Sequence, residues 1–201
     1  MAAMTAEPGG AGFFGKVPSH GDFVSRRLPA GFVAPWDAWL QAGLAESRVR
    51  LGERWLPLYL NSPVWRFALG AGVCGPQAWG GVVMPSVDRV GRYFPLTLAH
   101  VIAEDGMTPQ RWPAADMPWH NQLEALAMSC LDRGFSLALF DAALAALEAP
   151  PNGAVAGSGA PSILAGQVRF WRDGGAAPAA MALTGQGLPS LSTFTGEFLC
   201  N

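Results

Sequence analysis

The chain has 201 residues, of which 50% are hydrophobic and 14% charged, and its net charge is −2 at pH 7. This length suits one domain with an ordinary core, and the charge excludes the strongly basic surface typical of nucleic-acid binding. No run of about 18 apolar residues occurs, so we expect no membrane insertion. The first ten residues, MAAMTAEPGG, lack the basic and apolar regions of a secretory signal. We therefore expect a cytoplasmic protein with a disordered N-terminus over residues 1–10.

The first predicted element is a short strand, AGFFGKV, at residues 11–17. Residues 10–16 also spell G-x-x-x-x-G-K, the start of a phosphate-binding loop. That motif needs Ser or Thr after the lysine to bind magnesium, but Val17 follows Lys16, and no buried strand precedes the motif. We therefore favour a strand with a phenylalanine in the core and glycines in tight backbone over a nucleotide site.

A helix is predicted over residues 34–52, followed by a shorter one over residues 53–60 that is interrupted or kinked at Pro57. Six residues of the first helix recur at helical spacing and should form its buried face: Trp36, Trp39, Leu40, Gly43, Leu44 and Ser47. Arg48 and Arg50 lie in its last turn, where positive charge suits the helix dipole.

Three strands are predicted next, over residues 64–69, 78–85 and 93–102. Only the short segment PSVDRVGR joins the last two, so we expect them to form an antiparallel hairpin. The strict alternation in YFPLTLAHVI predicts a half-buried strand, with His100 on its apolar face as a core histidine.

Two helices, over residues 121–134 and 136–147, precede a Pro/Gly/Ala-rich linker at residues 149–162 that we expect to be mobile. A strand at residues 167–171, a further candidate at 179–183 and a closing helix at 191–199 complete the chain. The order predicts a single α+β domain over residues 11–201. Its central sheet should be largely antiparallel, with about five strands and helices packed on its faces.

The polar residues offer several weak catalytic or metal patterns. Ser19, His20 and Asp22 are triad residue types, but neighbours on one turn seldom reach triad geometry, so we favour a turn in which Ser19 and Asp22 cap backbone amides. His120 and Glu124 are one helical turn apart, which is weak evidence for a metal. We predict neither catalytic residues, nor a metal, nor any cofactor.

The hairpin tip carries Asp88, Arg89 and Arg92, which could recognise a partner or a phosphate group, or could pair with each other and hold the turn. From the residues alone we favour the structural role. Five of the eight tryptophans fall where a core is expected, at positions 36, 39, 55, 65 and 79, although some could belong to an interface. The three cysteines are far apart and odd in number, which indicates buried free thiols.

Four segments together resemble the TagF family, accessory proteins of the bacterial type VI secretion system. They are GFFGKVPSHGDFVSRRLPAGF, PWDAWL, ERWLPLYLNSPVWRFAL and WGGVVMPSVDRVGRYFPLTLA. The resemblance covers residues 12 to about 148 well and continues more loosely through VRFWRDGG and GLPSLSTF. Within it, GKVPSHGDF is similar to a family motif, G-K-x-P-S-x-G-D-F, that does not bind nucleotides.

The resemblance implies a cytoplasmic, non-enzymatic, post-translational regulator of type VI secretion, generally a repressor. Such a protein acts with a forkhead-associated scaffold protein and is linked to a threonine kinase–phosphatase pair. The candidate partner-binding residues are the polar members of the two motif segments: Lys16, Ser19, Asp22, Asp88, Arg89 and Arg92. The alternative is an enzyme or sensor that uses the same polar cluster for a phosphate or nucleotide ligand. A network that only stabilises the fold is the structural alternative.

Overall fold

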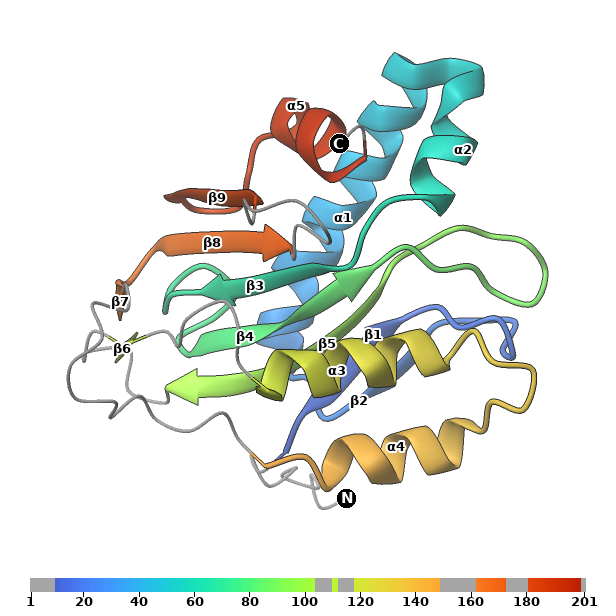
Figure 1. Cartoon of the computed structure of the whole chain (residues 1–201). Helices are drawn as coiled ribbons and strands as arrows, with labels where there is room; N and C mark the ends of the chain where they lie inside the picture. The colour runs from blue at the N-terminus through green and yellow to red at the C-terminus, as the bar shows by residue number, and fades with distance from the viewer. Residues whose placement is uncertain (1–9, 104–109, 112–117, 149–161, 173–180, 200–201) are drawn as a thin grey trace, which may run out of the picture.

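The computed structural model describes residues 10–103, 110–111, 118–148, 162–172 and 181–199 (Figure 1). Of the N-terminus predicted to be disordered (residues 1–10) and the predicted linker (residues 149–162), residues 1–9 and 149–161 lie outside this described part, and Ser162 already belongs to a strand. The elements in chain order are β1 (Gly12–Gly15), β2 (Val24–Arg26), α1 (Ala30–Leu51), η1 (Gly52–Arg54), α2 (Trp55–Leu60), β3 (Trp65–Leu69), β4 (Ala78–Met84), β5 (Leu96–Ala103), β6 (Gln110–Arg111), α3 (Pro118–Ser129), α4 (Leu137–Ala145), β7 (Ser162–Ile163), β8 (Gln167–Arg172), β9 (Met181–Gln186), α5 (Leu191–Thr193) and η2 (Phe194–Phe198).

One large antiparallel sheet organises the molecule. Its strand order is β2-β1-β5-β4-β3-β8-β9, and every neighbouring pair is antiparallel. The α+β class and the antiparallel sheet were predicted correctly, as was the hairpin of β4 and β5. The predicted number of about five strands was wrong, because the sheet has seven. Its outermost strands are β2, a segment of three residues that was not predicted, and β9.

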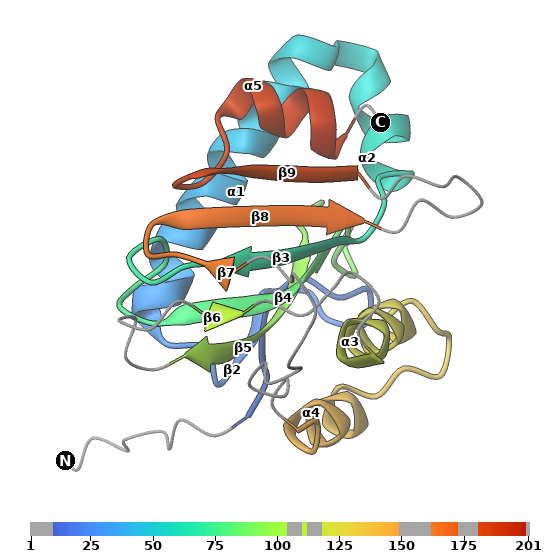
Figure 2. The ribbon, with the colours of Figure 1, turned by 60° about the vertical axis from the view of Figure 1, so that its left-hand side comes forward.

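Helices cover both faces of the sheet (Figure 1, Figure 2). α1, α5 and η2 lie on one face, and α3 and α4 lie on the other, with α3 against β4 and β5. The sheet therefore has a large hydrophobic core on each face, which we call the α1-side core and the α3-side core, and a smaller third cluster includes Trp171 and Ile163. The α1-side core is rich in aromatic side chains, among them Trp36, Trp39, Phe67, Phe170 and Phe194.

α1 has the buried face that its periodicity predicts. All six residues of the predicted stripe are buried, together with Phe32. Gly43 is the closest point of approach to the C-terminal helix, because a Cβ at this position would lie 2.6 Å from the Phe194 ring. The predicted kink at Pro57 was wrong: α2 begins at Trp55, so Pro57 lies in its first turn, where no backbone amide is needed for the helix.

β5 corrects the expectation of a half-buried strand. Leu96 and Leu98 enter the α3-side core, whereas Thr97 and Ala99 on the opposite face are fully buried against the α1 side. The Nε1 of Trp36 donates a hydrogen bond to the Thr97 hydroxyl at 2.9 Å. His100 is only half-buried. The alternation correctly predicted which residues share a face of the strand, but helices cover both faces of the sheet and bury residues on each.

The other core predictions stand for the described residues. The five tryptophans at positions 36, 39, 55, 65 and 79 are all buried, and Cys74 and Cys130 are buried free thiols. The closing helix is present as α5 and the π-helical turn η2.

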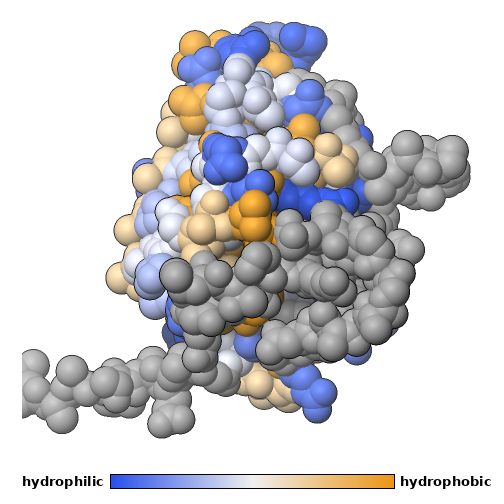
Figure 3. Space-filling view, turned by 90° about the vertical axis from the view of Figure 1, so that its left-hand side faces the viewer, coloured by the Kyte–Doolittle hydropathy of each residue, from blue (hydrophilic) through white to orange (hydrophobic). Residues whose placement is uncertain are grey.

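The end of α1 and the following η1 project beyond the sheet, at the top of the molecule (Figure 1). The exposed residues of this tip include Arg48, Arg50, Glu53 and Arg54. The side of the molecule in Figure 3 is mostly hydrophilic at its top, with single hydrophobic residues between. We therefore regard this tip as a solvated surface.

Candidate functional site

The two polar segments picked out in the sequence meet in the fold. We call residues 16–23 and 85–95 together the hairpin junction. The Lys16 Nζ donates a hydrogen bond to Asp88 Oδ2 at 2.8 Å, and the Arg92 Nε donates to the same oxygen at 2.7 Å. The backbone amide of Arg89 donates to the carbonyl oxygen of His20 at 2.9 Å. Ion pairs and backbone bonds thus join the first loop to the hairpin.

The carboxylate of Asp88 is the centre of this junction. Its Oδ1 accepts hydrogen bonds from the backbone amides of Val90 at 3.0 Å and Arg92 at 2.9 Å. The Asp88 side chain is 0% exposed and that of Lys16 is 7% exposed. Burial alone would raise the pKa of Asp88, but the hydrogen bonds from Lys16, Arg92 and Val90 together lower it well below its usual range. Asp88 is therefore a buried, ionised anchor for the hairpin.

A second layer of hydrogen bonds ties α2 to the same place. The Tyr59 hydroxyl donates to the carbonyl oxygen of Ser86 at 2.8 Å and accepts from the Ser86 amide at 2.9 Å. The Ser86 hydroxyl in turn donates to the carbonyl oxygen of Lys16 at 2.7 Å. Burial raises the pKa of Tyr59 above its usual range, so this hydroxyl stays protonated. Hydrogen bonds therefore join three segments at the junction: the first loop, the hairpin and α2.

Around this buried anchor lies a set of exposed side chains, which we call the junction rim: Ser19, Asp22, Phe23, Arg89, Val90 and Arg92. Phe23 is 43% exposed and Val90 is 66% exposed. The ring of Phe23 packs on Phe94, with ring centroids 4.8 Å apart, and Lys16 Nζ lies 5.1 Å from its centroid. The Arg92 guanidinium also donates to the carbonyl oxygen of Gly21. The rim is therefore a supported surface with both charged and apolar parts.

All six predicted site residues lie in the hairpin junction, but they divide into two kinds. Lys16 and Asp88 are buried and can only support the surface. Ser19, Asp22 and Arg89 are exposed. Arg92 has both roles, because it bonds the buried Asp88 and 57% of its side chain is exposed. Phe23 and Val90 belong to the same surface and were not predicted. Their sequence neighbours could have indicated them, because Phe23 ends the G-D-F motif and Val90 follows the candidate residue Arg89 at the hairpin tip.

The phosphate-loop pattern has a structural explanation. Residues Gly12–Gly15 form β1, which pairs with β2 and β5, and Lys16 is committed to Asp88. No helix follows Lys16 to present amides to a phosphate. The glycines do fit tight backbone, since a Cβ on Gly15 would lie 2.1 Å from the Pro95 carbonyl oxygen.

The triad pattern is likewise a turn. The Ser19 hydroxyl lies 2.8 Å from His20 Nδ1, instead of capping a backbone amide as expected. Asp22 does bond a backbone amide, that of Phe23, at 2.8 Å. A triad needs the carboxylate behind the imidazole, and here Asp22 is engaged with its own turn.

Glu124, the carboxylate of the His120–Glu124 pair, is engaged by an arginine. Glu124 accepts a hydrogen bond from the buried Arg66 at 2.8 Å. Burial, followed by the positive charge of Arg66, lowers the pKa of His120 to about 3. Within the described ranges, no three His, Cys, Asp or Glu side chains are grouped so that they could hold a metal ion. Among the described helices, none has both the length and the apolarity needed to cross a bilayer.

Comparison with known proteins relates the chain to one family and to solved structures. The family model "TagF N-terminal domain, Type VI secretion system-associated" matches residues 12–147. The crystal structure of PA0076 from Pseudomonas aeruginosa PAO1 superimposes with a TM-score of 0.80 and is 38% identical in sequence. This similarity covers 94% of the present chain and 93% of that chain. No curated protein matches. The family match includes both segments of the hairpin junction.

Proposed function

Because the chain belongs to the TagF family of type VI secretion-associated proteins, we propose that it is a non-enzymatic regulator of type VI secretion that binds a protein partner through the junction rim. The proposed partner is the forkhead-associated scaffold protein of the secretion system. Binding would withhold this scaffold from assembly in the cytoplasm, so the expected direction of control is repression. The threonine kinase–phosphatase pair would act on the same scaffold.

One observation carries this proposal: a fully buried carboxylate holds an exposed mixed surface in place. Asp88 receives four hydrogen bonds, two of them from the charged side chains of Lys16 and Arg92. Side chains that are already ordered lose less entropy on binding. Arginine and aromatic side chains are also the residue types enriched among binding hot spots. The rim combines both properties.

The binding test uses the purified chain and the forkhead-associated scaffold protein of the same organism, with affinity measured by calorimetry. The variant Arg89→Ala/Val90→Asp alters two exposed side chains and leaves the Asp88 hydrogen bonds in place. We expect it to weaken binding at least tenfold while the melting temperature stays within about 1 °C. Arg133→Ala is the matched control, since Arg133 is also an exposed arginine, located between α3 and α4.

Unchanged affinity in the rim variant would remove the rim from the interface and leave the partner assignment intact. Absence of binding by the unmodified chain would rule out this scaffold as the direct partner. Regulation is tested separately in cells. Deletion should raise secretion and overproduction should lower it, whereas the opposite response would make the protein an activator.

A further inference from the structure

The two outermost strands of the sheet differ in how they are protected from pairing with another strand. β2 has only three residues, and one of them is Arg26. Arg26 and the following Arg27 both form ion pairs with Asp141 of α4. β9 has six residues, MALTGQ, without a charged side chain or a proline. Short length, charge and proline are devices that keep a sheet edge from pairing with other chains, and β9 has none of the three.

The register of β9 shows which of its backbone groups point outward. In an antiparallel ladder, pairs that exchange hydrogen bonds alternate with pairs that do not. The amide of Gly187 donates to the carbonyl oxygen of Gly166 at 2.7 Å, at the end of the β8–β9 ladder. Counting back in twos, Gly185 and Leu183 also lie in bonded pairs with β8. The residues between them direct their N–H and C=O groups away from β8; they are Ala182, Thr184 and Gln186.

The other side of β8 supports this assignment. The amide of Gly70, after β3, donates to the carbonyl oxygen of Gln167 at 2.7 Å, so Gln167 bonds toward β3 and leaves its neighbour on β9 unpaired. The three outward residues of β9 are exposed, and their outward groups have no hydrogen-bond partner in the part of the chain that the structure describes. The six residue pairs with β8 are in continuous register, without a bulge. β9 therefore presents a regular row of unpaired donors and acceptors.

We propose that β9 pairs with β9 of a second copy of this chain, antiparallel and about a two-fold axis at Thr184. Each Thr184 then faces its counterpart, and Ala182 faces Gln186 on either side of the axis. Each of these three pairs can form two main-chain hydrogen bonds, because all of the groups concerned point outward. The edge is thus complementary to itself, which is the property that a two-fold interface requires.

The absence of charge favours a second copy as the occupant of this edge. Identical strands bring like side chains together, so a charged edge repels its own copy. Pairing of β2 about Ser25 would place two copies of Arg26 on one diagonal, about 7–8 Å apart. Pairing of β9 about Thr184 places no charged side chain of the strand near its counterpart, and Thr–Thr neighbours across two strands are favourable. Leu183 packs against the α1-side core and so supports the edge from one face.

This inference does not rest on the proposed function of the junction rim. β2, which directly follows Phe23 of the rim, and β9 are the opposite edges of the sheet (Figure 2). Pairing through β9 therefore leaves the rim of each copy free and joins two rims in one assembly.

The first test measures the mass of the purified full chain by sedimentation equilibrium, from micromolar to millimolar concentration. The parent should shift from 21.1 kDa, the mass of one chain, to twice that mass. Thr184→Pro removes one outward N–H from each copy and so two hydrogen bonds from the pair, and we expect association to weaken about tenfold or more. Because this N–H does not bond β8, the variant should keep the circular dichroism spectrum of the parent.

A charge exchange identifies the occupant as a second copy. Thr184→Lys and Thr184→Glu should each weaken self-association, because like charges would face each other across the axis. An equimolar mixture of the two variants should restore it, since a lysine then faces a glutamate. Ser25→Lys is the matched control, because Ser25 is the exposed central residue of β2, and it should leave association unchanged.

Three results would overturn the proposal. The parent could stay monomeric over the whole concentration range. Thr184→Pro could associate as strongly as the parent, or the mixed lysine and glutamate variants could associate no better than either alone, and both would assign the contact to another surface. Loss of association in Ser25→Lys would assign it to the β2 edge instead.

Discussion

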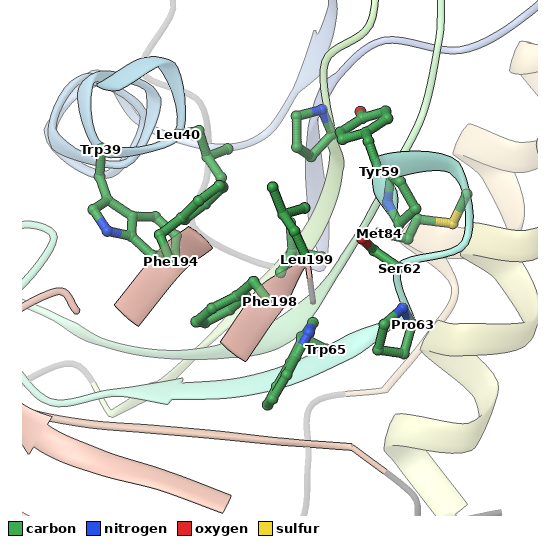
Figure 4. Close-up of a pocket in the computed structure, with 13 residues that line it drawn as sticks. Trp39, Leu40, Tyr59, Ser62, Pro63, Trp65, Met84, Phe194, Phe198 and Leu199 are labelled. Carbon is green, nitrogen blue, oxygen red and sulfur yellow. The ribbon is translucent and has the colours of Figure 1, made fainter. Parts of the chain in front are cut away.

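The hairpin junction lies beside an apolar pocket that Trp39, Tyr59, Trp65 and Phe198 help to line (Figure 4). The two regions share the hairpin of residues 85–95, because Pro85 and Pro95 also line the pocket, and they differ in how their buried polar atoms are satisfied. At the junction, the Asp88 carboxylate receives four hydrogen bonds, and both of its ion-pair partners lie in the same chain. At the pocket, the Trp65 N–H has no acceptor among the described residues. The junction is therefore complete without a ligand, and its binding capacity lies in its outer rim. The pocket wall, in contrast, leaves one buried N–H without an acceptor in the described part of the chain.

Gly15→Ala should break the junction most severely. Gly15 has φ +142°, and a Cβ there would lie 2.1 Å from the Pro95 carbonyl oxygen and 2.8 Å from the Leu96 Cα. Both atoms are backbone and cannot move aside cheaply. We expect no cooperative unfolding transition in a thermal melt followed by circular dichroism.

Gly91→Ala is the control for that prediction. Gly91 also has positive φ, +85°, but a Cβ there meets nothing within 4 Å. Only backbone strain remains, so we expect a fall of about 3 °C in melting temperature. Similar losses in the two variants would mean that steric contact is not the reason for glycine at position 15.

Asp88→Ala should have the next largest effect. It leaves Lys16 buried without its carboxylate and removes the bonds to two backbone amides. Loss of one member of a buried ion pair is strongly destabilising, and we expect the melting temperature to fall by about 10 °C. A melting temperature within about 2 °C of the parent would show that the junction is not the anchor described above.

Acid should weaken the junction selectively. The pKa of Asp88 is lowered in the folded chain, so its unfolded form binds the proton more readily. The stability it contributes is complete above its ordinary pKa of about 3.9 and is lost as the pH falls through and below that value. Urea unfolding of the parent and of Asp88→Asn should therefore differ by a constant amount above about pH 4. The difference should begin to shrink below that pH and continue to shrink down to the lowered pKa of the folded state. A difference that is constant with pH would assign the effect to packing.

The smallest expected effect is a difference in unfolding free energy between variants of two buried tryptophans, one with a hydrogen-bond acceptor and one without. Trp36 and Trp65 are 0% and 2% exposed, but only Trp36 has a hydrogen-bond acceptor, the Thr97 hydroxyl. Trp36→Phe should cost about 1 kcal/mol more in unfolding free energy than Trp65→Phe, since it also leaves a buried hydroxyl without its donor. Urea titrations measure both. Equal costs would mean that the Trp65 N–H already has an acceptor.

The elements set by local periodicity were predictable from the sequence. The α1 stripe was correct at every position because helical spacing alone decides which side chains share a face. β2 was missed since the three residues VSR carry no pattern, and only pairing with β1 makes them a strand. Burial of both faces of β5 was missed for a related reason. Alternation cannot reveal a helix such as α1, which comes from a distant part of the chain and covers the second face.

The site was predictable only in part. The polar residues of both segments were identified, but the Lys16–Asp88 pair joins positions that are far apart in the chain, and no spacing rule reveals such a contact. Which of these residues are buried and which are exposed could not be predicted, because Asp88 and Arg89 are adjacent in sequence but Asp88 is buried and Arg89 is exposed. Trp65 could not be distinguished by sequence from hydrogen-bonded core tryptophans such as Trp36 and Trp39, since the difference is an absent hydrogen bond, which Trp79 shares among the described residues.

The strand order also bears on how the chain matures during synthesis. One edge of β3 pairs at once with β4, but its other edge waits for β8, where Phe67 meets Phe170. Until the last part of the chain has left the ribosome, an apolar strand carrying Trp65, Phe67 and Leu69 has an unpaired edge, and α1 lacks its contact with η2. Unpaired apolar edges are prone to association between chains. Late closure of the sheet therefore leaves the nascent chain open to association until β8 is made, although the finished sheet protects the same strand between β4 and β8.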